Sequence, residues 1–137
     1  MIEVCVVKIP TEMEANYAIV AVGGKQFWVE PGRFYDVNSL GLEAGATVTL
    51  DQVLLVHCGG QVQIGRPTVP EARIEGKVLA ARRGPKIIVY KMRPKKKTRK
   101  KTGHRQELTR VLVEKIIVGD QEFTAPAREE REEAVAA

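Results

Sequence analysis

The sequence has few of the residues from which catalytic and metal sites are usually built. It contains two cysteines and two histidines in 137 residues, and Cys5 and Cys58 lie far apart and outside any C-x-x-C spacing. Two isolated thiols do not indicate a disulfide or a zinc site, and they suit a reducing compartment. His57 precedes Cys58, but adjacent strand residues point to opposite faces, which is poor geometry for a base and its nucleophile. We therefore expect no enzyme activity, no metal, no cofactor and no small-molecule substrate.

Long apolar segments and helical patterns are also missing. No stretch approaches the roughly 20 residues of a transmembrane helix, and the acidic N-terminus lacks the basic start of a signal peptide. No segment repeats apolar residues at the spacing of an amphipathic helix, so we expect little helix. The composition, with 44% hydrophobic and 28% charged residues, is ordinary for a globular protein. We expect no membrane partner.

Aromatic residues make up only 5% of the chain, and they are scattered. This pattern does not resemble the stacked aromatic platform of single-strand binders, which argues against a module that reads RNA sequence. Positions inside predicted strands favour core packing or cross-strand pairing instead. The residues concerned are Tyr17, Phe27, Trp28, Phe34, Tyr35, Tyr90 and Phe123.

What the chain does contain is a series of short β-patterned segments separated by glycine-bearing turns. Gly23-Gly24 is typical of a tight hairpin turn, and it lacks the glycine spacing and following Ser/Thr of a phosphate loop. Strands at this spacing predict an all-β fold, a small closed or nearly closed barrel of antiparallel strands. The predicted strands cover residues 17–22, 25–30, 34–38, 47–57, 61–64, 73–81, 86–92 and 108–118.

These strands delimit a single domain, residues 17–119, which includes a long basic loop at 93–106. Residues 1–16 form an N-terminal extension and residues 120–137 an acidic C-terminal extension, and we expect both to be flexible. The acidic extension can solubilise the chain, shield the basic loop before assembly or contact a neighbouring protein.

The strongest signal is a basic run without a single carboxylate. Between Lys91 and Arg105, ten of fifteen residues are lysine, arginine or histidine, and β-patterned segments hold the run at both ends. So dense an internal cluster repels itself, which predicts a polyanionic partner. Arginine can stack on bases as well as fork onto phosphate oxygens. A solvated basic loop without a partner is the alternative.

A second basic group surrounds Gly84-Pro85, which we predict to be a turn. It consists of Arg82, Arg83 and Lys86, and it precedes the strand that feeds the basic loop. In a hairpin the group lies at the opposite end of that strand, so RNA that contacts both would follow the side of the domain. Solvated turn charges explain the group equally well.

The motifs resemble those of the bacterial-type large-subunit ribosomal protein twenty-one family. The resemblance covers residues 17–118, and the run V-E-P-G-R-F-Y-D-V (29–37) is most similar to cyanobacterial or plastid members. The motifs that carry it are Y-A-I-V-A-V-G-G-K-Q-F (17–27), V-L-L-V (53–56), I-G-R-P (64–67), K-I-I-V-Y-K-M-R-P-K-K-K (86–97) and G-H-R-Q-E-L-T (103–109).

The resemblance implies a small β-barrel whose extended loop binds and helps to fold large-subunit ribosomal RNA in a bacterial cytoplasmic or plastid ribosome. It implies a structural role, with neighbouring large-subunit ribosomal proteins as partners, and we expect no self-association. A free RNA-binding barrel or RNA chaperone without a fixed ribosomal address is the alternative. The predicted RNA-binding residues are Lys25, Gln26, Arg82, Arg83, Lys86, Lys91, Arg93, Lys95, Lys96, Lys97, Arg99, Lys100, Lys101, His104, Arg105 and Gln106.

Overall fold

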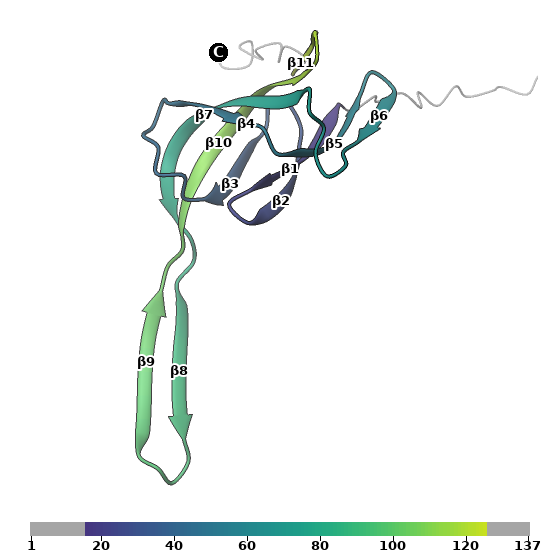
Figure 1. Cartoon of the computed structure of the whole chain (residues 1–137). Helices are drawn as coiled ribbons and strands as arrows, with labels where there is room; N and C mark the ends of the chain where they lie inside the picture. The colour runs from purple at the N-terminus through teal and green to yellow at the C-terminus, as the bar shows by residue number, and fades with distance from the viewer. Residues whose placement is uncertain (1–15, 126–137) are drawn as a thin grey trace, which may run out of the picture.

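The computed structural model describes residues 16–125, which contain β-strands and no helix. The expected flexibility of residues 1–15 and 126–137 lies outside the described part of the chain. In chain order the strands are β1 (Tyr17–Val22), β2 (Lys25–Val29), β3 (Phe34–Asn38), β4 (Thr47–Leu50), β5 (Val53–Cys58), β6 (Gln61–Ile64), β7 (Ala72–Arg83), β8 (Ile87–Arg93), β9 (Thr98–His104), β10 (Glu107–Val118) and β11 (Gln121–Thr124). Figure 1 shows their arrangement.

Two antiparallel sheets form the body of the molecule, and a third, two-stranded sheet projects from it (Figure 1). The first sheet has the strand order β2-β1-β5-β6. The second has the order β11-β10-β7-β4, with β3 also paired to β10. The predicted all-β, antiparallel architecture is confirmed. Within residues 16–125 no sheet closes on itself, so the predicted closed barrel is not confirmed.

The core lies between the two body sheets and consists mainly of β-branched side chains. Val20, Val56, Ile74, Val113 and Ile116 are each at most 2% exposed. In β1 the buried residues alternate with half-buried ones, as expected for a strand with one face on the core. Valine and isoleucine are stiff at χ1 and pack well on a pleated surface, which favours the sheet over any alternative here.

Strand β10 changes the face that it presents to the core. The sequence pattern placed apolar residues on both faces of this segment, and one of two irregularities in its pairing with β7 explains why. The irregularity between Arg110 and Val111 leaves Leu79 of β7 unpaired and does not change the alternation in β10, whereas the one between Val113 and Lys115 leaves Glu114 of β10 unpaired. A bulge inserts an unpaired residue and reverses the alternation that follows. Val113 and Ile116 therefore both reach the core although they differ in parity.

Strands β8 and β9 form an arm that continues the β7–β10 pair out into solvent (Figure 1). We define the arm as residues 87–104 and the neck as residues 84–86 and 105–106. The predicted turn at Gly84-Pro85 is wrong, because the chain passes through the neck without reversing. Pro85 has no N–H to donate to a ladder, and across the neck the Gly84 N–H donates to the Gln106 carbonyl at 2.8 Å.

Three further differences concern strand boundaries. The predicted loop at 93–106 is a strand over Thr98–His104, so only residues 94–97 form a loop at the tip. The predicted strand at 47–57 is interrupted at Asp51-Gln52 and forms β4 and β5. Strand β11 was not predicted, and it pairs with β10 inside the segment assigned to the C-terminal extension.

Residues 16–125 include no helix of the length and hydrophobicity that crossing a bilayer requires.

Candidate nucleic-acid interface

The arm is a fully exposed ribbon with uncompensated positive charge. Every residue of β8 and β9 is exposed, and no Asp or Glu occurs from Arg82 to Gln106. None of the ion pairs found in residues 16–125 includes an arm cation. The charges therefore face water, and the arm attracts polyanions.

The register of β8 and β9 divides the outer half of the arm, residues 90–93 and 98–101, into two faces. Directly opposite residues in an antiparallel pair share a face. The first, the Tyr90 face, carries Tyr90, Met92, Arg99 and Lys101. The second, the Lys91 face, carries Lys91, Arg93, Thr98 and Lys100.

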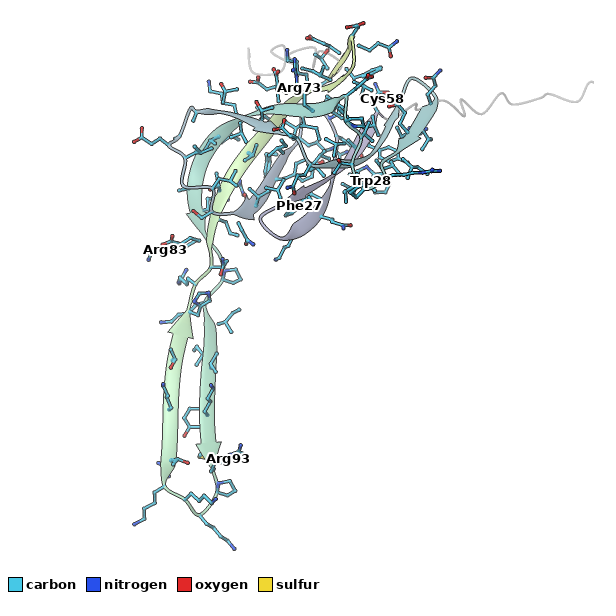
Figure 2. All side chains as sticks on the ribbon, viewed as in Figure 1. Phe27, Trp28, Cys58, Arg73, Arg83 and Arg93 are labelled. Carbon is cyan, nitrogen blue, oxygen red and sulfur yellow. The ribbon has the colours of Figure 1, made fainter. Side chains whose placement is uncertain are left out.

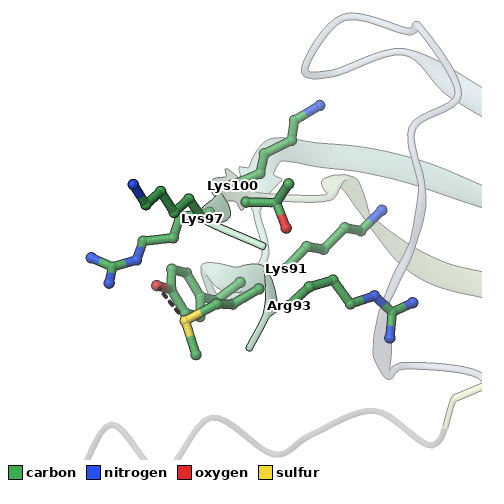
Figure 3. A pocket seen from close by; sticks show the side chains of 8 residues that line it. Lys91, Arg93, Lys97 and Lys100 are labelled. Atoms are coloured by element: carbon green, nitrogen blue, oxygen red, sulfur yellow. Dashed lines mark hydrogen bonds between the residues drawn. The ribbon is translucent and has the colours of Figure 1, made fainter. Parts of the chain in front are cut away.

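The two faces differ in chemistry. The Tyr90 hydroxyl donates to the Met92 sulfur at 3.4 Å, so ring and thioether form one apolar surface with a cation across from each. Figure 3 shows Lys91 and Arg93 pointing away from this hydrogen-bonded pair. The hollow along this part of the arm is lined by Tyr90, Lys91, Met92, Arg93, Lys97, Thr98, Arg99 and Lys100.

The tip holds three consecutive lysines in a turn. The Lys96 N–H approaches the Arg93 carbonyl at 3.4 Å. Lys95 and Lys97 have positive φ angles of 64° and 52°. This left-handed conformation costs a residue with a Cβ about 1–2 kcal/mol. The tip thus presents its charges at a local conformational cost, which a partner can offset.

The predicted G-H-R-Q element spans the base of the arm and the neck, where it lies beside Lys86. The His104 Nε2 and Gln106 Oε1 atoms lie 3.1 Å apart. A Cβ added to Gly103 would lie 2.6 Å from Lys86 Cε, so the lysine stem crosses the glycine. Arg82 and Arg83 end β7 just before the neck, whereas Arg93 ends β8 at the far end of the arm (Figure 2). The predicted opposite-end placement holds, although the segment is not a turn.

Lys25 and Gln26 belong to the body and not to the arm. They open β2 after the Gly23-Gly24 turn, whose φ angles of 57° and 81° match the predicted hairpin. The Asn38 side chain donates to the Gly23 carbonyl at 2.7 Å, and Asn38 is paired with Leu108 at the start of β10. This sequence of contacts places the turn at the end of the body from which the arm leaves.

The sequence did not predict that Tyr90 and Met92 are exposed on the arm. Aromatics were expected in the core or in cross-strand pairs, but Tyr90 is 53% exposed and lies opposite Lys101. The available signal was its context, an apolar alternation that runs directly into the basic segment. The aromatic expectation does hold elsewhere, because the Tyr17 and Trp28 ring centroids on neighbouring strands lie 4.5 Å apart.

The outer face of the first sheet is a second exposed surface, and it lacks lysine and arginine. We call it the apolar face. Two rows of directly opposite residues cross the sheet there. Several side chains in them are open to solvent, most of all Ile64 at 74% exposed. One row is Trp28, Ile19, Leu55 and Ile64, and the other is Tyr17, His57 and Val62.

The cysteine and histidine of β5 are separated as expected from strand geometry. Cys58 is buried, and burial raises the pKa of its thiol to about 11. The His57 ring instead stacks on Tyr17, with 4.9 Å between ring centroids. A protonated, buried thiol is a poor nucleophile at neutral pH. Residues 16–125 contain no cluster of three or more His, Cys, Asp or Glu residues suited to a metal ion.

Comparison with known proteins gives consistent similarities. The family model described as "Ribosomal prokaryotic L21 protein" matches residues 16–116. A protein of Cyanothece sp. named "Large ribosomal subunit protein bL21" is 56% identical over 122 residues, which span 89% of this chain and 94% of the relative. One of that name from Thermosynechococcus vestitus is 60% identical over 100 residues, 73% and 90% of the two chains. "Large ribosomal subunit protein bL21c" of Phaeodactylum tricornutum is 57% identical over 103 residues, 75% and 98% of the chains.

Proposed function

Because the chain belongs to the family of prokaryotic L21 ribosomal proteins, we propose that its arm binds large-subunit ribosomal RNA and helps to hold that RNA folded. Membership makes the chain a structural constituent of the large ribosomal subunit, in a bacterial cytoplasm or a plastid. The RNA contact through the arm is the further step, and it rests on the geometry of the arm.

One observation carries this step: a carboxylate-free segment is held out from the body as an exposed β ribbon. A ribbon that contacts only water gains nothing from its own charges, since they repel one another. Phosphates neutralise these charges and release condensed counterions, so the energy of ordering the ribbon is recovered on binding. The projection also allows the charges to enter a folded RNA while the body remains at its surface.

The predicted residues take different parts in this contact. Lysines at the tip and along the arm meet phosphates as point charges, whereas arginines fork onto phosphates or stack on bases. His104 is held beside Gln106 and contributes a polar or stacking contact at the neck. Arg82, Arg83, Lys25 and Gln26 extend the contact to the end of the body nearest the neck. RNA shape and backbone position, more than base identity, fix the placement.

The test is the triple variant Lys95→Glu, Lys96→Glu, Lys97→Glu, measured for binding to the source cell's large-subunit ribosomal RNA over a range of salt concentrations. The body should remain folded, because the tip has no contact with it. Binding should weaken and its salt dependence should flatten. The control makes the same charge change on exposed body residues with Arg66→Glu, Arg73→Glu and Lys77→Glu. Equal binding by both triple variants would refute the proposal.

A free RNA chaperone would use the same charges without a fixed address. It predicts similar affinity for unrelated structured RNAs, so competition with excess transfer RNA separates the two functions. Near-stoichiometric retention on large subunits after a high-salt wash supports the structural role. Release into mixed RNA fractions supports the chaperone.

Contacts with neighbouring large-subunit proteins are proposed for the apolar face. Ile64, Val62 and Trp28 are each more than half exposed there, and its two rows contain no lysine or arginine to meet a phosphate. Exposed apolar area of this kind marks a protein contact more often than an RNA contact.

A further inference from the structure

The side chains on the two faces of the arm suit different parts of an RNA molecule. Near the neck, β8 is apolar on both faces, whereas in the outer half the apolar groups lie on one face only. This asymmetry does not serve the packing of the core, because every residue of β8 and β9 is exposed and none belongs to the core. It therefore points to the surface that the arm contacts.

The Tyr90 face combines a flat apolar surface with cations at its border. Tyr90 is 53% and Met92 51% exposed, and the hydrogen bond between them holds ring and thioether together. Lys101 and Arg99 lie directly across the ladder from them. A partner that covers this face must be flat and apolar in its middle and anionic at its edges. A nucleobase with its flanking phosphates meets both requirements.

The Lys91 face has no such apolar centre. Lys91, Lys100 and Arg93 bring three cations together with one threonine, and the two lysines are a directly opposed pair. Like charges in this position destabilise a sheet unless an anion lies between them. Phosphate oxygens are the groups in RNA that fit there.

We infer that the arm lies between two segments of RNA, with an unpaired base stacked on Tyr90 and Met92 and with backbone phosphates held by Lys91, Arg93 and Lys100 on the other face. This inference rests on the proposed function and deepens it. The arm is then a two-sided wedge, and a single RNA strand that follows one side of it cannot fill both sets of contacts.

The experiment compares variants of the two faces in binding to full-length large-subunit ribosomal RNA transcribed from the source cell's gene. Tyr90→Ala and Tyr90→Leu should weaken binding about 5- to 150-fold, the effect of losing one stacked base, with an unchanged salt slope. Tyr90→Phe should keep most of the affinity, because the ring is kept and only its hydrogen bond to Met92 is lost. The double variant Lys91→Ala, Lys100→Ala should lower the salt slope by about two.

Chemical probing of base reactivity gives a second readout. One unpaired base should be protected by the unchanged protein and by Tyr90→Phe, and should become reactive with Tyr90→Ala and Tyr90→Leu. The agreement of the Ala and Leu variants separates loss of the aromatic plane from loss of apolar bulk in the strand.

The outcomes are distinct. If the Tyr90 variants bind normally while the lysine pair lowers the salt slope, the stacking inference is overturned and the proposed function stands. If neither change has an effect, the inference is overturned. The proposed function then stands if the triple tip variant still weakens RNA binding, and it is overturned with the inference if that variant also binds normally. If Tyr90→Ala instead abolishes salt-resistant binding to vesicles of anionic phospholipid and leaves RNA binding intact, the Tyr90 face serves a membrane and the inference is overturned.

Discussion

Lys91 and Lys100 lie directly opposite each other across the β8–β9 ladder, with no carboxylate anywhere in the arm. Opposed like charges weaken strand pairing, by up to about 1 kcal/mol. The positive φ angles of Lys95 and Lys97 add to this cost at the tip. An anion between the opposed lysines turns their repulsion into attraction, and its binding can offset the conformational cost at the tip, so the arm is arranged for its bound state at the expense of its free state.

Lys100→Glu should therefore have opposite effects on the two states. In the free protein, the new ion pair with Lys91 replaces a repulsion and should strengthen the pairing of β8 with β9. In RNA binding, the same change removes a phosphate contact and adds a negative charge that repels phosphates, so the affinity for RNA should fall. Hydrogen exchange of the arm amides measures the first effect and a salt titration the second.

Lys100→Gln is the matched control for this prediction, because it removes the repulsion without adding an attraction. Its amide protection should lie between those of the unchanged protein and Lys100→Glu. If Lys100→Glu exchanges faster than the unchanged protein, the charge opposition across the ladder is not what limits the stability of the free arm.

The core of the body and the arm should respond differently to the same kind of substitution. Ile116→Ala should lower the unfolding free energy by about 2–5 kcal/mol, because Ile116 is completely buried. Ile88→Ala should change it by no more than about 0.5 kcal/mol, since Ile88 is 56% exposed on the arm. Denaturant titration of both variants measures the contrast. Similar losses would mean that the arm packs against the body in solution.

The example of Ile88 shows where the sequence pattern is informative and where it is not. Strong β-branched alternation located nearly all the body strands, because the core demands one apolar face per strand. The β-branched residues in β8 carry no information about burial, since the sequence pattern of an apolar strand is the same whether the strand packs on a core or is exposed. For this reason the exposure of Tyr90 and Met92 was not predicted.

The basic segment predicts a class of partner, but it did not predict its own shape. Charge density alone indicated a polyanion, and the run was interpreted as a loop because Thr98–His104 lacks apolar alternation. Pairing with β8 gives this segment its strand conformation, a non-local effect that local propensity does not contain. Gly84-Pro85 was misread for a related reason: Gly and Pro signal a break in a ladder, and the fold resumes the ladder after the break.

The pair formed by Asp36 and Arg110 should make stability depend on pH. Two hydrogen bonds, of 2.8 and 2.9 Å, join the guanidinium to both oxygens of the carboxylate across β3 and β10. The hydrogen bond from Arg110 holds the pKa of the Asp36 carboxyl below its ordinary value, although partial burial opposes this shift. The Arg110 guanidinium also lies 4.3 Å from the centre of the Phe34 ring, which helps to fix its position.

A lowered folded-state pKa means that the contribution of Asp36 is fully present above the unfolded value of about 3.9 and is lost as pH falls through the folded value. Asp36→Asn should therefore be less stable than the unchanged protein at neutral pH. The difference in unfolding free energy should shrink as the pH is lowered below about 4. Denaturant titrations from pH 7 to pH 3 measure it, and a difference that stays constant over this range would contradict the assignment.

The apolar face of the first sheet should matter for assembly but not for RNA affinity. The double variant Val62→Lys, Ile64→Lys places two cations on exposed positions of β6, so the unfolding free energy should change by no more than about 0.5 kcal/mol. Added cations cannot weaken an electrostatic contact with RNA. Retention on large subunits after a salt wash should nevertheless fall, because a charged residue inside an apolar protein contact is left unpaired.

The matched control is Gln61→Lys with Gln63→Lys, which makes the same charge change on the same strand with the side chains on its other face. This variant should be retained like the unchanged protein. The two variants have the same total charge, and we expect their RNA affinities to be equal in a binding titration. Loss of retention only in the Val62 and Ile64 variant would then assign the apolar face to a neighbouring protein. Full retention of both would mean that this face is exposed to solvent in the assembled subunit and that RNA contacts alone hold the protein in place.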